Sequence, residues 1–453
     1  MDVVDPSTGE RIESYADHTQ LEVEEALDRA NAAFEDWRLR PVREREELLA
    51  AAGEVLRENK HKYAETMTRE MGKPVSQALA EVEKCAWGCD HYAEHASAYL
   101  EPEGHPSPPG AAVETVYEPL GPVLAVMPWN FPFWQVFRFA APSLTAGNVG
   151  LLKHASNVPG CSMAIEEVFR EAGYPEGVFQ SLLIPSDLVE GILADDRVRA
   201  ATLTGSGPAG RAVASTAGEY LKKTVLELGG SDPFIVLDDA DISAAAEIGA
   251  RARNQNGGQS CIAAKRFIVH TDVYQAFLDK FTEAVSSLTV GDPMDEETDV
   301  GPQARQDLLE DLHGQVEASV EAGARVVTGG VPLDRQGAYY PPTILTEIPE
   351  GCPVDAEETF GPVAAVYEVP DENAAIRKAN DTEFGLGASI WTEDRERGER
   401  LARQIDTGNV YVNQLVKSDP RVPFGGVKES GYGRELSNAG IMEFVNRKTV
   451  WVE

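Results

Sequence analysis

Basic residues are scarce in this sequence of 453 residues, which has 40 Lys and Arg against 75 Asp and Glu and a net charge of −35 at pH 7. A surface with so few cations lacks the basic face that binds nucleic-acid phosphates, and anionic membrane lipids repel it. We therefore expect no nucleic-acid partner and no membrane partner. The acidic residues are spread along the chain, which is typical of a solvated, halophilic surface. Because salt screens the repulsion within such a surface, we hypothesise a salt-rich cytoplasm.

Cysteine and long apolar runs are also rare. Five scattered cysteines do not form a disulfide framework, and their odd number indicates a reducing compartment. The most apolar stretch, 123–142, is interrupted by Pro128, Asn130, Pro132 and Arg138, so it cannot supply the ~20 apolar residues of a membrane span. The N-terminus shows no signal-peptide pattern. With 42% hydrophobic residues, the composition is that of a globular protein, and the length suggests two or three domains.

Strand-like and helix-like segments alternate along most of the chain. Residues 19–100 have the pattern of helices, and a proline-rich connector follows at 101–110. Strands are predicted at 123–127, 149–153, 178–183, 200–204 and 224–228, and a second set at 234–237, 267–270, 363–369, 387–391 and 409–412. The intervening helices favour an α/β fold with two successive doubly wound units. A last strand at 448–452 could pair outside its own domain.

The first candidate for chemistry is Cys261. Glycines and small polar residues surround it in the segment 256–262, and Lys265 and Arg266 follow closely. An accessible thiol in a positive local field is a useful nucleophile, because the field stabilises the thiolate. A loop thiol can also be incidental, and the residues alone leave both interpretations open.

The second candidate is Glu227, which ends an apolar strand before Gly229 and Gly230. Partial burial there would raise its pKa toward the range of a general base. The segment 205–210 matches the G-x-G-x-x-G pattern of dinucleotide sites, whose ribose ligand is an acidic residue about 20 positions further on. Glu227 fits that position too. The residues alone therefore leave it as a general base, a ribose ligand or a solvated strand end.

One predicted helix carries two cysteines and two histidines, residue types that can bind a metal ion. Cys85 and Cys89 lie one helical turn apart, and so do His91 and His95. Zinc sites are usually built from turn-type cysteine pairs with distant partners. We therefore expect ordinary helix packing here and predict no metal site.

Seven segments, taken together and in order, resemble the NAD(P)-dependent aldehyde dehydrogenase superfamily. They are PWNFP at 128–132, LK at 152–153, TGS at 204–206, ELGG at 227–230, GQSC at 258–261, EETFGP at 357–362 and PFGGVKESG at 423–431. The likeness covers nearly the whole chain and is closest to short succinate-semialdehyde dehydrogenases. It implies a variant Rossmann cofactor domain, an α/β catalytic domain and a small β bridging element. These would comprise 1–100 with 119–229, 230–442, and 101–118 with 443–453, respectively.

The resemblance implies roles in catalysis for three residues. Cys261 would attack an aldehyde to form a thiohemiacetal, while the Asn130 side-chain amide and the Cys261 backbone N–H would bind the oxyanion. After hydride transfer to the cofactor, Glu227 would activate the water that hydrolyses the thioester. The resemblance thus favours the general base among the three interpretations of Glu227, and a free acid as product over acyl transfer to coenzyme A.

Cofactor residues are implied in the same way. Gly205 and Ser206 would face the pyrophosphate, Lys153 the adenosine ribose, Glu358 the nicotinamide ribose, and Trp129 and Phe360 the nicotinamide end. Ser156 stands where an acidic residue would repel the 2′-phosphate of NADP, and its hydroxyl is a donor. We therefore expect NADP to be accepted, with NAD as an alternative cofactor.

The implied substrate residues are Arg138, Gln255, Ser418 and Phe424. Arg138 would bind the far carboxylate of a semialdehyde acid through paired hydrogen bonds, and Ser418 would contact the same carboxylate. Gln255 occupies a position that is a second arginine in some members. The alternative for Arg138 is an ion pair on a helix surface with one of the many acidic residues.

We therefore predict oxidation of succinate semialdehyde, or of a related semialdehyde acid, to the carboxylic acid. The alternatives are a glutarate-semialdehyde or general aliphatic aldehyde dehydrogenase, a cofactor-independent thiol esterase, and a non-catalytic binding protein. By resemblance, bridging elements of this kind pair subunits, so we expect a homodimer or homotetramer, located in the cytoplasm.

Overall fold

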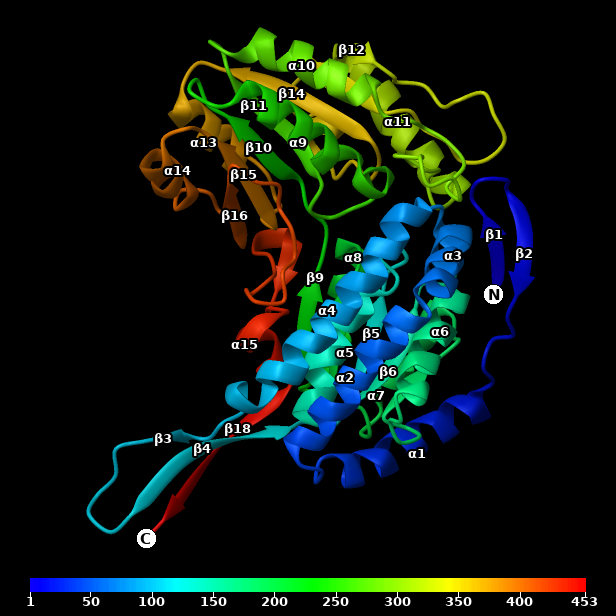
Figure 1. Cartoon of the computed structure of the whole chain (residues 1–453), viewed down its shortest axis with the longest axis vertical. Coiled ribbons are helices and arrows are strands. Elements are labelled where there is room, and N and C mark those ends of the chain that lie inside the picture. Colours follow the sequence, from blue (N-terminus) through cyan, green and yellow to red (C-terminus); the bar gives the residue numbers. More distant parts are fainter.

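The structure, a computed structural model, describes all residues from 1 to 453 (Figure 1). Two open sheets with helices packed around them form the two halves of the molecule, and a thin three-stranded arm projects from one end (Figure 1). None of the helices is long and apolar enough to cross a membrane.

The first sheet has six strands in the order β17-β9-β8-β5-β6-β7. They are β5 (Pro122–Met127), β6 (Val149–His154), β7 (Phe179–Ser181), β8 (Ala200–Thr204), β9 (Lys223–Glu227) and β17 (Gly431–Tyr432). Strands β5 to β9 are parallel, and β17 pairs with β9 in the antiparallel sense. Every residue of β6 and β8 is buried. Strands covered on both faces need no alternation of polar residues, which explains their apolar runs.

The helices of this half pack into one core of 67 buried hydrophobic residues. They are α1 (Gln20–Trp37), α2 (Val42–Glu58), α3 (Lys60–Met71), α4 (Val75–Tyr99), α5 (Trp134–Ala146), α6 (Pro159–Glu171), α7 (Val189–Ala194) and α8 (Gly207–Glu219), with a short 3-10 turn η1 (Ser186–Leu188). Thr19 and Glu22 form a reciprocal capping box that begins α1. Gly72, at a φ of 77°, ends α3 in the left-handed conformation that glycine adopts most easily.

The second sheet has seven strands in the order β12-β13-β14-β11-β10-β15-β16. They are β10 (Asp232–Val236), β11 (Ala264–His270), β12 (Arg325–Thr328), β13 (Thr343–Thr346), β14 (Val363–Val369), β15 (Gly387–Trp391) and β16 (Asn409–Val412), of which only β12 is antiparallel to its neighbour. Its helices are α9 (Ile242–Asn254), α10 (Tyr274–Ser286), α11 (Gln306–Ala322), α12 (Pro353–Ala356), α13 (Glu372–Asn380) and α14 (Arg395–Ala402). The chain enters this half directly after β9, through 228–231 (Figure 1).

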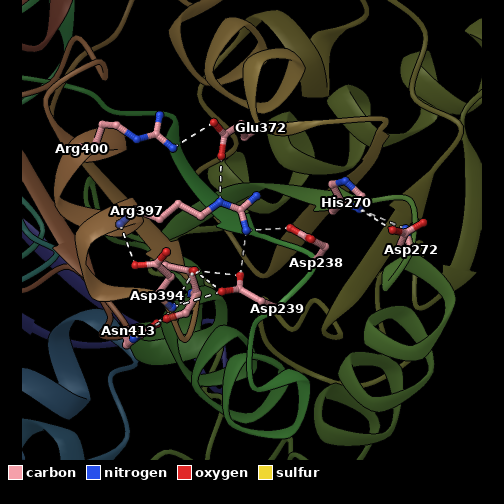
Figure 2. A network of polar contacts seen from close by, with 10 residues as sticks. Asp238, Asp239, His270, Asp272, Glu372, Asp394, Arg397, Arg400 and Asn413 are labelled. Atoms are coloured by element: carbon pink, nitrogen blue, oxygen red, sulfur yellow. Dashed lines mark hydrogen bonds and ion pairs between the residues drawn. The ribbon is translucent and has the colours of Figure 1, made fainter.

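A network of charged side chains ties helices of the second half to the loop after β10 (Figure 2). The Arg397 guanidinium, on α14, lies 2.8 Å from Asp238, 3.1 Å from Asp239 and 2.8 Å from Glu372, which begins α13. The Thr392 hydroxyl donates to Asp239 in the same network. One half-buried cation therefore balances several of the abundant acidic groups and connects α14 and α13 to the loop after β10.

The arm pairs β4 (Ala112–Pro119) with β3 (Glu103–Gly104) and, over eight residues, with the C-terminal β18 (Val445–Val452). A separate hairpin, β1 (Asp2–Asp5) and β2 (Glu10–Ser14), lies at the N-terminus. The remaining short elements are the 3-10 turns η2 (Gln255–Gly258) and η3 (Lys428–Ser430) and the helix α15 (Ser437–Ile441).

The predicted fold class, two α/β units with a small β element, is confirmed. All ten predicted strands of the two sheets are present, and the runs at 200–204, 363–369, 387–391 and 409–412 match their bounds fully. The sequence analysis missed the N-terminal hairpin and the pair β12 and β13, which complete one edge of the second sheet.

Candidate active site

The candidate site lies between the two halves of the molecule. Trp129 and Asn130 follow the carboxyl end of β5, and Glu227 is the last residue of β9. Cys261 and Glu358 come from the other half, in the segments that precede β11 and β14. The carboxyl ends of parallel strands are where open α/β sheets place their ligand sites, and the second sheet supplies a facing wall.

A strained turn positions Cys261. Asn256, Gly257 and Gly258 have φ values of 57°, 62° and 72°, a left-handed run that a β-branched residue would not adopt. A side chain on Gly258 would overlap the backbone of Gly361, so this turn packs directly against the segment that carries Glu358. The glycines thus let two backbones meet beside the thiol.

Buried polar groups hold the same loop from both sides. The Nζ of Lys265 donates to the carbonyl oxygens of Ser260 and Cys261, each at 2.9 Å. The Nδ2 of Asn130 donates to the carbonyl of Gln259 at 3.2 Å, and the Asn130 carbonyl accepts from Asn256 at 2.7 Å. The Asn130 amide is therefore fixed against the backbone that carries the thiol, as a donor for a developing oxyanion must be.

The thiol of Cys261 is half-buried and is not held as a thiolate in the free chain. Burial raises its pKa to about 12, although Arg138 and Lys265 act in the opposite direction. The expected stabilising field is therefore weaker than the sequence indicated. Arg266 does not contribute as expected, because its guanidinium donates to the backbone carbonyls of Ser231, Lys378 and Ala379.

The Glu227 carboxyl group lies in a buried environment. Its side chain is only 3% exposed, and its Oε1 has no hydrogen-bond partner. Burial, together with the neighbouring Glu435, raises its pKa well above the usual range, while Arg138 and Arg434 act against that shift. The direction that the sequence analysis expected is therefore found, and the solvated strand end is excluded.

A small cavity of about 80 Å³ joins the thiol to a set of polar groups. Cys261 lines it together with all four expected substrate residues, Arg138, Gln255, Ser418 and Phe424. The Arg138 guanidinium lies 4.8 Å from the centre of the Phe424 ring. A second cavity of about 590 Å³ shares Lys84, Phe131 and Gln255 with it as lining residues.

Arg138 lines this cavity and also forms a buried ion pair. Its Nε lies 2.6 Å from Oε2 of Glu435, and both side chains are almost fully buried. This ion pair is buried, unlike the helix-surface pair that was the alternative interpretation. Two residues missed by the sequence analysis, Glu435 and Lys84, complete the charged groups here.

Three of the expected cofactor residues, Glu358, Trp129 and Phe360, make contacts within the protein. The Glu358 carboxylate accepts from the backbone N–H of Gly230 at 3.0 Å and lies 3.5 Å from Lys265. The rings of Trp129 and Phe360 meet edge to face at 5.7 Å. Through Lys265, which also binds the Cys261 carbonyl, the Glu358 carboxylate is linked to the loop of the thiol.

A cavity of about 260 Å³ lies between α7 and α8, and the remaining expected cofactor residues are not among those that line it. Lys153 donates from Nζ to the hydroxyl of Ser186, which lines the cavity, at 3.2 Å. Ser206 precedes the first turn of α8, whose free backbone N–H groups suit a phosphate. Ser156 is exposed at the rim of β6. Apolar walls, a cation and a helix start together fit an adenine dinucleotide.

Another open cavity, of about 520 Å³ beside the N-terminal hairpin, contains none of the expected residues.

Comparisons with known proteins identify the family of the chain. The model of the Aldehyde dehydrogenase family matches residues 1–450. Probable succinate-semialdehyde dehydrogenase (NADP(+)) of Synechocystis sp. is 52% identical over 449 residues, 99% of either chain. Succinate-semialdehyde dehydrogenase (NADP(+)) 1 of Mycobacterium ulcerans is 50% identical over 450 residues, 99% of this chain and 98% of that protein. The crystal structure of succinic semialdehyde dehydrogenase from Streptococcus pyogenes with NADP+ is 38% identical, with a TM-score of 0.97, and covers 100% of this chain and 99% of that one. The chain belongs to the aldehyde dehydrogenase family.

Proposed function

We propose that this chain oxidises succinate semialdehyde to succinate with NADP+. The observation that carries the proposal is the cavity in which the Cys261 thiol faces Arg138, Lys84 and Ser418. An aldehyde carbon at the thiol and a carboxylate at the cationic end describe a short semialdehyde acid. The full-length relatives named for this reaction support the same substrate and cofactor.

The residues of the chain divide the chemistry between them. Once deprotonated, Cys261 forms a bond from its sulfur to the aldehyde carbon, and the oxyanion accepts from the Asn130 amide and the Cys261 N–H. Loss of one such donor typically raises the barrier by ~2.7–4 kcal/mol. The bound NADP+ supplies the hydride acceptor. Glu227 then takes a proton from the water that attacks the thioester, which releases the acid and restores the thiol.

A substrate panel tests this function, read by the absorbance of the reduced cofactor. We expect kcat/KM for succinate semialdehyde to exceed that for butanal, a neutral aldehyde of the same length, by about 10²-fold, because only the acid pairs with the buried cations. Glutarate semialdehyde, one methylene longer, should lie between the two. A chain that oxidised butanal as efficiently as the semialdehyde would be a general aliphatic aldehyde dehydrogenase.

The choice of cofactor is expected to depend on Ser156. A Ser156→Glu substitution should weaken NADP+ about ten- to a hundred-fold relative to NAD+, because a carboxylate would repel the 2′-phosphate. Ser156→Ala, the matched control, removes only a hydroxyl donor and should cost NADP+ a few-fold at most. Both effects are measured as KM for each cofactor. Unchanged NADP+ affinity in the glutamate variant would show that the phosphate binds elsewhere.

The proposal also covers the assembly and setting of the protein. We propose that residues 101–118 and 443–453 form a bridging element between subunits of a homodimer or homotetramer. Support comes from the projecting arm of β3, β4 and β18 (Figure 1). Two apolar side chains of β18, Trp451 and Val452, are exposed. The cofactor domain would comprise 1–100 and 119–229, and the catalytic domain 230–442. The acidic composition supports a salt-rich cytoplasm.

A further inference from the structure

The first turns of α4 hold the loop that carries Asn130, although they belong to none of the motifs. The Oε1 of Glu81 accepts from the backbone N–H groups of Phe133 and Trp134, at 3.0 and 2.9 Å. These groups begin α5, and Phe133, at the N-cap position, has no side-chain oxygen to accept from them. A carboxylate at this end of a helix also suits the helix dipole. Glu81 therefore fixes the chain just after Asn130.

Glu81 is itself held by a buried ion pair. Its Oε2 pairs with the Nζ of Lys73, which precedes α4, and the two side chains are only 2% and 1% exposed. The same Nζ lies 3.8 Å from the centre of the ring of Phe131, the residue directly after Asn130. Replacing a buried pair by apolar side chains of similar volume is often neutral for stability. The stability of the fold alone therefore does not account for this pair.

Gln77 lies one turn before Glu81 in α4 and contacts the other half of the molecule. Its Oε1 accepts from the backbone N–H of Asn256, in the strained turn before Cys261, at 2.7 Å. The Asn256 side chain donates in turn to the carbonyl of Asn130 at 2.7 Å. A chain of hydrogen bonds thus runs from α4 through the turn of the nucleophile to Asn130.

The Asn130 amide keeps one donor hydrogen for a ligand. Its Nδ2 carries two hydrogens, and the Gln259 carbonyl accepts one of them at 3.2 Å. An amide of this kind assists the reaction only if it lies where the oxyanion forms, and a misplacement of about 1 Å can cost about 10²-fold in rate. Contacts that fix the backbone around Asn130 should therefore affect kcat.

We propose that Glu81 and Gln77 are positioning residues, which keep the Asn130 amide at the place where the oxyanion forms beside Cys261. Glu81 acts on the loop after Asn130, and Gln77 acts through Asn256. This inference rests on the proposed function, in which Asn130 is the oxyanion donor. The alternative role is the packing of α4 against α5, which would affect the chain independently of the Asn130 amide.

Two double variants isolate the acceptor oxygen at position 81. Lys73→Met/Glu81→Gln removes both charges but keeps an oxygen for the N–H groups of α5, whereas Lys73→Met/Glu81→Met removes the oxygen as well. We expect the second chain to lose about 10- to 100-fold in kcat for succinate semialdehyde and the first to retain most of its kcat. KM should change less than about three-fold in both. It is measured separately, because Gln77 and Glu81 also line the cavity of about 590 Å³.

The charge control is Glu83→Met, two residues further along α4. It removes an exposed carboxylate that pairs with Arg57 at 3.2 Å. Exposed pairs contribute little, so its kcat should stay within about two-fold of the wild type.

A double-mutant cycle with Asn130→Ala distinguishes positioning from packing. Asn130→Ala alone should lower kcat about 10²- to 10³-fold. In that background Lys73→Met/Glu81→Met should cost less than about three-fold more than Lys73→Met/Glu81→Gln, because the donor that Glu81 positions is absent. Alkylation of Cys261 by iodoacetamide, which needs no oxyanion donor, should keep the wild-type rate within about two-fold in every chain. Losses that multiply with that of Asn130→Ala, or slowed alkylation, would overturn the inference and leave the reaction in place.

The remaining outcomes separate the inference from the proposed function. Wild-type turnover in Asn130→Ala would refute Asn130 as the oxyanion donor, and with it the proposed mechanism on which the inference rests. If Lys73→Met/Glu81→Met does not fold, the half-buried Gln77 decides. Gln77→Met should lower kcat about three- to ten-fold, but not in the Asn130→Ala background, while Gln77→Glu, which keeps the acceptor oxygen, should retain it. An unchanged kcat in Gln77→Met would then refute the inference.

Discussion

Aldehyde oxidation is expected to fall at least about 10⁴-fold in kcat/KM when Cys261 is replaced by alanine, because no other group of the cavity can form the covalent bond to the carbonyl carbon. The other cysteines, Cys85, Cys89, Cys161 and Cys352, are all buried outside this cavity and cannot substitute for it. The measurement is steady-state turnover with succinate semialdehyde and NADP+.

The matched control for this substitution is Cys352→Ala, which deletes a thiol at the start of α12. Its kcat/KM should stay within about two-fold of the wild type, because Cys352 lies in a separate hydrophobic cluster. Hydrolysis of an ester by the wild-type chain without any cofactor, at a rate comparable to aldehyde oxidation, would favour the thiol esterase instead. Aldehyde oxidation retained in Cys261→Ala would refute the assigned nucleophile.

Replacing Glu227 by glutamine is expected to separate the two halves of the reaction. Steady-state turnover should fall about 10²- to 10⁴-fold, since general-base catalysis contributes that much. Formation of the first equivalent of reduced cofactor should persist, because the amide removes the base for hydrolysis while Cys261 remains. Rapid mixing should therefore show a burst of about one equivalent per site, with the acyl group retained on the protein.

The pH dependence gives this prediction a second measurement. Only the carboxylate form of Glu227 accepts a proton, and its pKa is raised well above the ordinary value by burial and by Glu435. The kcat of the wild type should therefore increase as the pH rises through that elevated pKa, and the glutamine variant should lose this limb. Loss of the burst together with turnover would instead assign Glu227 to an earlier step.

Folding is not expected to confound this variant. A carboxyl group whose folded pKa lies above its unfolded value lowers stability once the pH exceeds the unfolded pKa. Glutamine carries no such penalty, so Glu227→Gln should be at least as stable as the wild type at neutral pH. Glu429→Gln, at an exposed carboxylate paired with Arg211, is a suitable control, and its turnover should be unchanged.

The fold was largely predictable because burial leaves a direct mark on sequence. Strands such as β8, buried along their whole length, appear as runs of only about five apolar and β-branched residues, too short for a helix. β12 is half exposed and lies at the sheet edge, and β2 is exposed throughout, so neither carries that mark. Their strand character depends on the partners they pair with, which local sequence does not specify.

The candidate site was predictable where its residues lie in motifs, and not where they meet only in space. Cys261, Glu227 and Asn130 belong to recognisable segments, whereas Lys84 reaches Ser418 across more than three hundred positions of the chain. The only local signal for Lys84 is its place on the packed face of α4, next to the buried Cys85. Lys265 and Arg266 follow Cys261 in sequence, yet both are directed at backbone carbonyls rather than at the sulfur. The closeness of Lys265 and Arg266 to Cys261 in sequence therefore predicted a stronger positive field at the thiol than the structure has.

The turn at Gly258 packs directly against the backbone of Gly361. The loop that carries Cys261 and the segment that carries Glu358 are therefore in contact. A side chain at Gly258 would force these two segments apart, because its Cβ would overlap the Gly361 backbone. Natural variation in this region should consequently be found in the surrounding helices, with these two glycines left untouched.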